Sequence, residues 1–598
     1  MNRGTQLVLA VVALAHVYTF MHLPVLNNPN ENVRIYMTHA LAEDGTLAIG
    51  QRTVDASGRA RDGEGPTARW GYVNDKALVC ASPEDTPPIC EGTLYSAKAP
   101  GTSFLGVPAH LLITAATSEE LSLRDLTRAL RFLCLTIPTL LFALFFARFL
   151  TRHIRRPVVV CAVLAGWGIG SMGFTYGQLF AGHQLTALAL FTGFMAWDEG
   201  RSATGWARRR ADMLFGAGLS FAVLFEYPAL FPAVLLGLAF LREPMALRRL
   251  GAVVIGALPA GALLVTFHTR AFGAPWRTPY SWLENPGFVA DISPGWMGLQ
   301  APNWEAFHGS FLAPYNGLFF FAPWMALVLF AAASRLRQGW SEDPSRHAMT
   351  AALAVFATYA LFISSHSLWR GGWTLGPRYI AGCVPFVALA VGLAIDRSAG
   401  RILRVALPTL AGLITASIVI TGACSLVSQG FPFEFHNPFT ELALPLLLDG
   451  HVAENLGNLA GLSGIASIAP LLLVIAITCG ALLWASADGS DGWSRLTGLA
   501  TGAAVLVAAL WLATSPQEAF NEGKHKKDRW LRAHWMPEDQ APASARRQAL
   551  NERRGEGPMA GADWLELGNL EARAGNRAAA LARYRAAMEE FATRESGR

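Results

Sequence analysis

Long apolar stretches separated by short polar segments recur along the chain as far as residue 514. Many are roughly 17 to 25 residues long, the length that a helix needs to cross about 30 Å of hydrocarbon. The pattern predicts an all-α polytopic membrane protein with about thirteen spans. The two short stretches on either side of Glu226 also fit one kinked helix. We place the spans at 5–26, 127–150, 157–176, 182–197, 211–225, 229–241, 251–268, 318–334, 349–364, 379–395, 404–423, 464–486 and 496–514.

The overall composition agrees with a protein that lies in a bilayer. Of its 598 residues, 52% are hydrophobic and 15% are charged, against roughly 25% charged residues in ordinary soluble domains. The net charge of +5 lies mostly in predicted cytoplasmic loops, which suits anionic lipid rather than nucleic acid. The sequence contains no P-loop and no GxGxxG after a strand, so ATP and nicotinamide chemistry are not expected.

Arginine-rich loops give the orientation, because short loops rich in Arg or Lys stay on the cytoplasmic side. Such loops occur on alternate sides of the predicted spans, and the first contains Arg3. They predict a multi-pass protein of the bacterial inner membrane with a cytoplasmic N-terminus and an external C-terminus. The first apolar run is too long for a cleaved signal peptide and lacks a small-x-small site, so we expect it to be retained.

The first external segment, 27–126, is predicted to be folded. The residues after Glu31 are amphipathic as far as Gly45, which predicts a helix. Residues 51–65 are rich in Gly, Arg and Asp without periodicity, which predicts a loop. The other expected elements are short strands at 70–79 and 89–95 and a helix in the membrane interface at 101–116.

Cysteine usage separates this segment from the membrane part. Five of the seven cysteines lie in or beside apolar spans, where a thiol behaves as a small hydrophobe. Cys80 and Cys90 flank ASPEDTPPI in the external segment, and we expect a disulfide between them in an oxidising compartment. Two ligands are too few for a closed zinc site, which uses four. No metal site and no cofactor are predicted, and the sequence does not support a divalent-metal requirement.

Two polar groups of the first external segment carry candidate chemistry. Glu31 follows the first span, and Lys98 precedes Pro100 and Gly101 at the start of the interfacial apolar run. Attack of a hydroxyl on an anomeric carbon needs a base near the acceptor and a cation near the departing phosphate. Glu31 is the candidate base and Lys98 the candidate phosphate ligand. The structural alternatives are a carboxylate at a helix N-terminus and a snorkelling interfacial lysine.

Further candidates lie beside these two groups and beside the spans. Arg34, three residues after Glu31, is expected to pair with it or to contact a donor, and Tyr95 is a supporting candidate. Glu226 lies in an apolar hairpin where an unpaired carboxylate is costly, so it either positions a substrate or is exposed.

The external turn at 365–379 combines arginines, which suit phosphate, with aromatic residues, which suit sugars or the interface. An aromatic belt with positive anchors is the alternative. The candidates in this turn are Arg378 and Arg370 as donor-phosphate ligands and His366, Trp369, Trp373 and Tyr379 as substrate ligands.

Several blocks of the sequence resemble the bacterial polytopic GT-C glycosyltransferases, which include protein O-mannosyltransferases and the aminoarabinose transferase that modifies lipid A. The blocks are Asn30-Glu31, Glu43-Asp44-Gly45, Tyr95-Ser96-x-Lys98-Ala99-Pro100-Gly101, and residues 217–230, 311–324 and 368–386. The resemblance implies that an acidic residue of the first external loop is the base and that a Lys-x-Pro element meets the phosphate of a polyprenyl-phosphate sugar. Many relatives carry two adjacent acids where this chain has Asn30 before Glu31, so the assignment rests on one carboxylate.

The chain changes character after a predicted transmembrane domain at 1–514. Residues 515–560 are charged and are predicted to be a linker. In 561–598, the spacing of Trp564, Leu567, Gly568, Ala580, Tyr584 and Ala587 fits one tetratricopeptide-like repeat, with Glu571 in place of the usual aromatic residue. One repeat cannot bury a full apolar face, so we expect a small helical hairpin that docks on the external loops, on a protein partner or on another copy.

Three classes of function fit these observations. The favoured class is a glycosyltransferase that moves a sugar from a polyprenyl-phosphate donor to an envelope lipid, glycan or protein at the external membrane face. An O-antigen ligase or polymerase is the second class, but its catalytic residues are expected in a late external loop. A transporter or flippase of a lipid-linked sugar is the third, and it would show paired halves, whereas no clear internal repeat is present. Membrane lipids are expected partners in each case.

Overall fold

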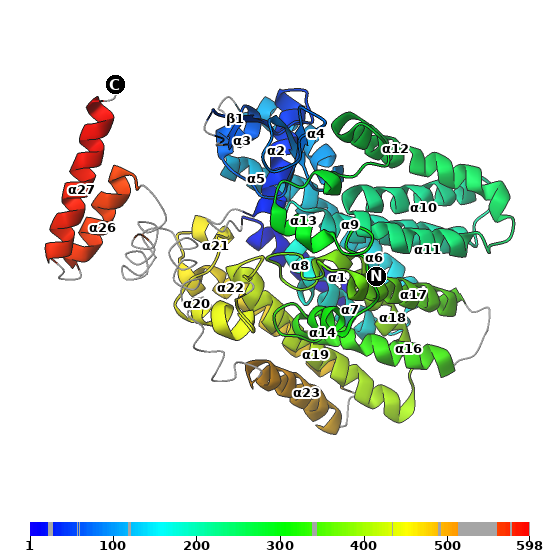
Figure 1. The fold of residues 1–598 in the computed structure, drawn as a ribbon. Helices are drawn as coiled ribbons and strands as arrows, with labels where there is room; N and C mark the ends of the chain where they lie inside the picture. Colours follow the sequence, from blue (N-terminus) through cyan, green and yellow to red (C-terminus); the bar gives the residue numbers. More distant parts are fainter. Residues whose placement is uncertain are drawn as a thin grey trace. The chain divides into compact units, whose positions relative to one another are not determined.

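The computed structural model describes residues 1–21, 28–56, 58, 60–117, 121–337, 344–432, 434–487, 492–511, 550, 559–573 and 577–596. The chain forms two compact units, of which the larger comprises Met1–His22, Asn28–Phe433 and Asn437–Leu512. Figure 1 shows the elements coloured along the sequence. The larger unit contains the first external segment and a bundle of long apolar helices.

The helix predicted after Glu31 is confirmed as α2 (Pro29–Glu43). It begins where it does because the Asn28 side chain accepts hydrogen bonds from the backbone N–H groups of Asn30 (3.1 Å) and Glu31 (3.4 Å). Pro29 at the first helical position needs no such partner. Local capping therefore fixes the start of α2 immediately before Asn30 and Glu31.

A four-stranded antiparallel sheet follows α2, with the order β2-β1-β4-β3. Its strands are β1 (Gly50–Val54), β2 (Ala60–Gly63), β3 (Lys76–Cys80) and β4 (Gly92–Ser96). The two strands predicted around the cysteines are present but shorter than expected. α3 (Gly65–Trp70) ends where the first was predicted to begin, and residues 71–75 connect it to β3 without regular structure.

The loop predicted at 51–65 is wrong, because β1 and β2 form a hairpin there. Arg52 lies opposite Asp62 in the register, and their side chains form an ion pair at 2.6 Å. Arg52 also contacts Glu284 at 2.9 Å. The hairpin is held by cross-strand charges rather than by alternating apolar residues, so residues 51–65 show no period-two pattern of hydrophobicity.

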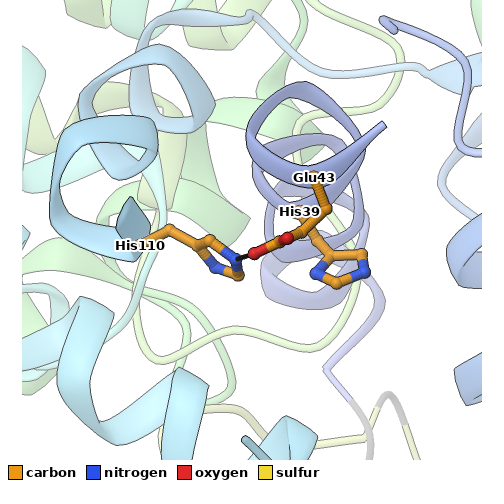
Figure 2. Close-up of side chains that lie close together, drawn as sticks. All are labelled: His39, Glu43 and His110. Atoms are coloured by element: carbon orange, nitrogen blue, oxygen red, sulfur yellow. Dashed lines mark hydrogen bonds and ion pairs between the residues drawn. The ribbon is translucent and has the colours of Figure 1, made fainter. Parts of the chain in front are cut away.

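The predicted helix at 101–116 is confirmed as α4 (Gly101–Ala116), and it packs beside α2. The Ser103 hydroxyl donates to the Arg34 carbonyl at 3.0 Å, which joins the two helices. One turn further along, His110 of α4 faces His39 and Glu43 of α2 (Figure 2). On its other side α2 buries Val33, Tyr36 and Met37 against the sheet and against α12 (Ala246–Phe272).

Seven helices of the described part are long and apolar enough to cross a membrane. They run over Leu123–His153, Ala246–Phe272, Ser345–Ser365, Arg378–Asp396, Gly400–Val427, Gly464–Ser486 and Gly492–Leu510. Further predicted spans are helical too, as α1 (Arg3–Thr19), α7 (Pro157–Ile169), α9 (Gly182–Gly200), α10 (Gly205–Phe225) and α11 (Leu230–Phe240). A mostly helical membrane protein is therefore confirmed, and about thirteen spans with the proposed orientation stay a prediction.

The remaining elements complete or connect these helices. They are α5 (Leu123–Arg131), a π-helical turn (Phe132–Thr136), α6 (Ile137–His153), α8 (Met172–Tyr176), α13 (Pro286–Ile292), α14 (Trp304–Phe311), α15 (Leu318–Phe321), α16 (Val328–Arg337), α17 (Pro344–Ser365), α18 (Val384–Asp396), α19 (Gly400–Val427), α20 (Leu444–Leu448), α21 (Leu456–Leu459), α22 (Gly464–Ser486) and α23 (Gly492–Trp511). Short 3₁₀ turns cover Tyr227–Ala229, Pro279–Trp282, Pro323–Leu327 and Arg378–Cys383, and a second π-helical turn covers Phe439–Ala443.

The centre of the bundle is formed by α7 and α18, whose residues are almost all buried. Trp167 of α7 lies against Phe142 and Phe146 of α6, with ring centroids 5.4 and 5.5 Å apart. In contrast, α22 and α23 present most of their apolar side chains at the surface, as expected for helices that face hydrocarbon.

The hairpin around Glu226 consists of two helices and not of one kinked helix. α10 ends at Phe225, Glu226 has extended backbone, and a 3₁₀ turn at Tyr227–Ala229 leads into α11. Pro228 in that turn has no N–H for a helix that would continue from α10. Glu226 therefore lies at the turn between two helices that pack side by side (Figure 1).

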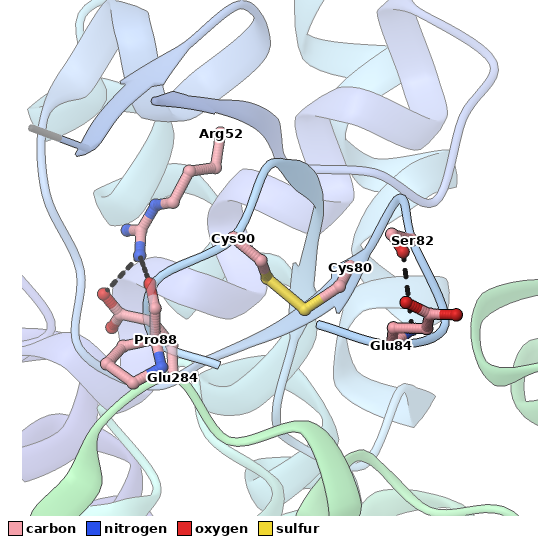
Figure 3. Close-up of a disulfide and its surroundings, with 7 residues drawn as sticks. All are labelled: Arg52, Cys80, Ser82, Glu84, Pro88, Cys90 and Glu284. Atoms are coloured by element: carbon pink, nitrogen blue, oxygen red, sulfur yellow. Dashed lines mark hydrogen bonds and ion pairs between the residues drawn. A yellow bond between two sulfur atoms is a disulfide. The ribbon is translucent and has the colours of Figure 1, made fainter. Parts of the chain in front are cut away.

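The predicted disulfide joins Cys80 at the end of β3 to Cys90, with Cα atoms 5.7 Å apart (Figure 3). It closes the loop whose Pro88 carbonyl accepts a hydrogen bond from Arg52 at 3.3 Å. The crosslink therefore secures the end of the sheet at which Arg52 and Glu284 meet.

Replacing Cys80 and Cys90 together by Ser is expected to destabilise the sheet by about 3 kcal/mol, the loop-closure estimate for a short crosslinked loop. Thermal unfolding of the detergent-purified protein measures the change as a lower melting temperature. Reductant should lower the melting temperature of the wild type to the same value and leave the double variant unaffected. Equal melting temperatures for the variant and the oxidised wild type would contradict this prediction.

The smaller unit contains two helices near the C-terminus, α26 (Gly561–Arg573) and α27 (Arg577–Ser596). They pack on each other, and the Tyr584 hydroxyl donates to the Asn569 side chain at 2.9 Å. A helical hairpin is therefore present where it was predicted, whereas its tetratricopeptide-like character stays a prediction. Nearly all of the predicted linker at 515–560 lies outside the described residues.

Candidate functional site

Six ionisable residues gather where the first external segment meets the helical bundle, and we call them the charged cluster. They come from six separate parts of the chain. They are Arg34 of α2, Asp75 before β3, Lys98 after β4, His183 of α9, Glu226 between α10 and α11, and Arg378 before α18.

Arg34 and Glu226 form the best-defined contact of the charged cluster. Arg34 Nη2 lies 2.6 Å from Glu226 Oε1, and the arginine side chain is completely buried while the glutamate is 13% exposed. The other end of the guanidinium donates to the Asn30 carbonyl at 2.8 Å. Arg34 Nε is buried and has no hydrogen-bond partner among the described residues. Burial lowers the pKa of Arg34, and the carboxylate of Glu226 opposes this effect.

His183 is the second neighbour of Glu226, with its Nδ1 atom 3.5 Å from Glu226 Oε1. The start of α9 comes this close because Gly182 has no side chain. A Cβ atom there would lie 2.2 Å from the Phe225 carbonyl oxygen and 2.6 Å from Glu226 Oε1. His183 is buried, and its Nε2 atom has no hydrogen-bond partner in the described part of the chain.

Lys98 and Asp75 form the second ion pair of the charged cluster, with Nζ and Oδ1 3.2 Å apart. The backbone holds them together, since the Ala97 N–H donates to the Asp75 carbonyl at 3.0 Å. The Lys98 side chain is 18% exposed and the Asp75 side chain 7% exposed. The Lys98 ammonium group has three N–H donors and therefore keeps donors that do not point at Asp75.

Arg378 is the cation of the charged cluster without a carboxylate of its own. Among the described residues no Asp or Glu lies within ion-pair distance of it, and its Nε atom is buried without a partner. The guanidinium lies 5.3 Å from the ring centroid of Tyr379. It runs along Gly371, which has φ +68°, and a Cβ atom at Gly371 would lie 3.1 Å from Arg378 Nε. A glycine is required there both for the backbone conformation and for the space.

The positive charge of the cluster exceeds its negative charge. His183 lies within electrostatic range of Arg378, Arg34 and Lys98, and these three cations face two carboxylates. Tyr280, after α12, is half-buried near Arg34 and Arg378, and the loss of hydration raises the pKa of its hydroxyl far above the usual value, which keeps it neutral. Buried donors with a net positive charge suit a phosphate group, because charge-assisted hydrogen bonds are strongest where water is excluded.

Glu31, the predicted base, is not in the charged cluster but in a buried ion pair with Arg131. Arg131 Nε donates to Oε1 at 2.6 Å and Nη2 donates to Oε2 at 2.5 Å. The Phe180 backbone N–H also donates to Oε1 at 2.7 Å. Both carboxylate oxygens are thus occupied, and both side chains are almost fully buried. The contact joins α2, the end of α5 and the segment before α9.

The expected pairing of Arg34 with Glu31 is therefore wrong, because Arg34 pairs with Glu226 and Glu31 with Arg131. Arg34 and Glu31 are three residues apart on one helix, but each forms its ion pair with a buried residue of another part of the chain.

The other candidates lie in packing contacts near the charged cluster. The Tyr95 ring packs edge-on against Phe272 at 5.7 Å. The Arg370 guanidinium lies over the Tyr315 ring at 4.6 Å, and Tyr315 also neighbours Trp369. Tyr379 contacts both Arg378 and His366.

Two candidates of the 365–379 turn have clear structural contacts. His366 is half-buried, and the loss of hydration lowers its pKa to about 4 and keeps it neutral. Its Nδ1 atom accepts a hydrogen bond from the Leu368 N–H at 3.0 Å. The Trp373 carbonyl lies close to the backbone of Gly430. The substrate roles expected for Tyr95, Arg370, His366, Trp369, Trp373 and Tyr379 stay predictions.

Two residues of the charged cluster were not predicted from the sequence. Asp75 lies in a polar stretch without a motif, and His183, at the start of a predicted span, is buried beside Glu226. For His183 a signal was available, because a histidine at the start of an apolar span is costly to bury without a partner. For Asp75 no sequence signal distinguishes it from other external acidic residues.

An apolar groove of about 700 Å³ lies between α16 and α17. Its wall includes Phe307, Leu329, Leu336, Leu353 and Leu361. Such a surface suits hydrocarbon in general. Because no residue of the charged cluster lines the groove, we assign it no substrate.

Comparison with protein-family models found no match, and comparison with curated protein sequences found none. Two crystal structures of ArnT from Cupriavidus metallidurans are similar to this chain. The structure bound to undecaprenyl phosphate has a TM-score of 0.43 and 13% identity, and the match covers 90% of this chain and 82% of that chain. The apo structure has a TM-score of 0.41 and 14% identity, with 83% and 76% covered.

Proposed function

We propose that the protein is a membrane glycosyltransferase that takes its sugar from a polyprenyl-phosphate donor, with the charged cluster as the reaction site. The observation that supports this best is that three cations, Arg34, Lys98 and Arg378, lie within electrostatic range of one buried position, that of His183. A phosphate that leaves with two negative charges is stabilised at such a point. The proposed site lies at the external face of the inner membrane.

Lys98 and Arg378 are the proposed ligands of the donor phosphate. Lys98 is partly exposed and Arg378 has no carboxylate partner in the described part of the chain, so both retain donors for an anion. Arg34 is already engaged by Glu226 and Asn30, so its proposed role is to hold Glu226 and to add positive charge. Arg378 offers a rigid planar fork, whereas Lys98 acts as a point charge.

Glu226 is the proposed base. It is the more exposed carboxylate of the charged cluster, and Asp75 is held by Lys98. The acceptor O–H gives its proton to Glu226 while the acceptor oxygen bonds to the anomeric carbon. The bond between that carbon and the phosphate oxygen breaks, and its electron pair leaves with the polyprenyl phosphate. His183, 3.5 Å from Glu226 Oε1, is placed to orient the carboxylate.

A structural role is proposed for Glu31 instead of the role of base. A base needs a free oxygen within reach of the acceptor proton, and both oxygens of Glu31 accept hydrogen bonds from Arg131. Its neighbour Asn30 is an amide and carries no charge. We therefore assign the role of base to Glu226, in the turn between α10 and α11, instead of to a carboxylate of the first external segment.

Donor binding is the first test of this proposal. Lys98→Gln and Arg378→Gln are each expected to weaken binding of undecaprenyl phosphate by about 10- to 150-fold, since a hydrogen bond to a charged group is worth about 1.5–3 kcal/mol. Native mass spectrometry of the detergent-purified protein or its titration with the lipid gives the affinities. Arg270→Gln, at an exposed arginine near the end of α12, is the matched control.

The proposed donor site fails if Lys98→Gln and Arg378→Gln bind the lipid as tightly as the control does. The activity itself is tested by release of polyprenyl phosphate from a panel of polyprenyl-phosphate sugars, with envelope extract as the acceptor. Wild-type turnover with one of these donors would establish a glycosyltransferase, and absence of turnover with all of them would contradict the proposed reaction.

A further inference from the structure

A second group of polar side chains lies between α2 and α4, apart from the charged cluster. It consists of His39 and Glu43, one turn apart on α2, and His110 on α4 (Figure 2). Each residue offers one ligand atom, and these atoms lie within 4.8 Å of one another. The His110 Nε2 atom is 2.7 Å from Glu43 Oε1. The sequence predicted no metal site, although His39 and Glu43 have the i, i+4 spacing that places two side chains on one helix face.

The chemistry of this group fits a divalent ion of the zinc class. Two imidazoles and one carboxylate are a usual set of three protein ligands for zinc, with a fourth position left open. Ligand atoms of a tetrahedral site with bonds of about 2.1 Å are about 3.4 Å apart. The separation of 2.7 Å between His110 and Glu43 and the limit of 4.8 Å for the three ligand atoms bracket that value, so small side-chain rotations suffice. The Nδ1 atoms of His39 and His110 are buried without hydrogen-bond partners among the described residues.

The surroundings leave room for the fourth ligand. The three residues line a cavity of about 240 Å³ together with Asp44, Arg69, Trp70 and Thr114, among others. A water molecule needs a small fraction of that volume. The His39 ring packs against Trp70 at 4.7 Å between centroids, which fixes one side of the group.

We propose that His39, Glu43 and His110 bind one zinc-class divalent ion whose fourth position is open to this cavity. The ion replaces the direct contact between His110 and Glu43 by two metal bonds and so ties α2 to α4. Arg34 lies on α2, five residues before His39, and α4 begins three residues after Lys98. The ion therefore fixes the relative position of the two helices next to the charged cluster. The proposal is independent of the reaction assigned to that cluster.

Metal binding by the full-length, tag-free protein in detergent tests this proposal. After treatment with a chelator, one equivalent of Zn²⁺ per chain is expected to bind, as measured by elemental analysis, and Co²⁺ is expected to give the visible absorption of a four-coordinate site. Added Zn²⁺ should raise the melting temperature, because an ion that binds only the folded state stabilises it.

Glu43→Gln and the double variant His39→Ala/His110→Ala are expected to weaken Zn²⁺ binding by at least about 100-fold, beyond the effect of losing an outer-shell partner. Glu43→Gln keeps a hydrogen-bonding group beside His110, so it guards against loss of folding. His308→Ala removes an exposed histidine and is the matched control. Zn²⁺ binding that is equal in all variants, or no binding to the wild type, would overturn the proposal.

Discussion

Glu226→Gln is expected to reduce turnover of a polyprenyl-phosphate sugar by about 100- to 10,000-fold, the usual contribution of a general base. The amide keeps a hydrogen-bond acceptor for Arg34, which lies 2.6 Å from the carboxylate in the wild type, but it cannot take the acceptor proton at neutral pH. Donor binding should change much less than turnover, because the phosphate is assigned to Lys98 and Arg378. Release of polyprenyl phosphate under single-turnover conditions, together with donor affinity, measures both quantities.

Glu305→Gln is the matched control for Glu226→Gln, because Glu305 is an exposed acid at the start of α14. It should leave turnover unchanged. Normal turnover in folded Glu226→Gln protein would remove Glu226 as the base and direct attention to Asp75. A large loss of melting temperature in Glu226→Gln would instead show that the carboxylate mainly holds Arg34, whose guanidinium is buried.

The second large effect is expected on stability, when one member of the Glu31–Arg131 ion pair is removed. Arg131→Met leaves the Glu31 carboxylate buried and unpaired, and Glu31→Leu does the same to the guanidinium. Either change is expected to destabilise the protein by about 3–5 kcal/mol, because breaking a buried pair leaves one charge without compensation. The double variant Glu31→Leu/Arg131→Met should recover most of this loss. Thermal unfolding in detergent and the yield of folded protein are the measurements.

An exposed ion pair is the control for Glu31 and Arg131. Arg124 contacts Glu454, and their side chains are 55% and 36% exposed, so Arg124→Met should cost less than about 1 kcal/mol. The assignment of Glu31 is tested in the same series. Glu31→Gln protein that melts like the wild type but has lost turnover would restore Glu31 as the base. A lower melting temperature with turnover retained in the folded fraction would support the structural role.

The sequence by itself determined the features that depend on local or one-dimensional properties. Apolar runs of membrane-spanning length predicted a helical membrane protein, because hydrocarbon thickness fixes how many apolar residues a helix needs. The amphipathic residues between Glu31 and Gly45 predicted α2, and the position of Cys80 and Cys90 on either side of a short loop predicted their disulfide. Lys98, Arg378 and Glu226 were also recognised, because ionisable residues beside apolar spans are costly and rare.

Only the tertiary structure decided which of these groups meet. Glu31 pairs with Arg131, 100 residues away, and Arg34 pairs with Glu226, 192 residues away. The β1–β2 hairpin depends on the pairing of Arg52 with Asp62, and the group of His39, Glu43 and His110 depends on how α4 packs on α2. Hydropathy predicts which segments are buried in the protein or the membrane. A buried ion pair depends instead on the distance and direction between two side chains. Those are set by the packing of helices far apart in the sequence.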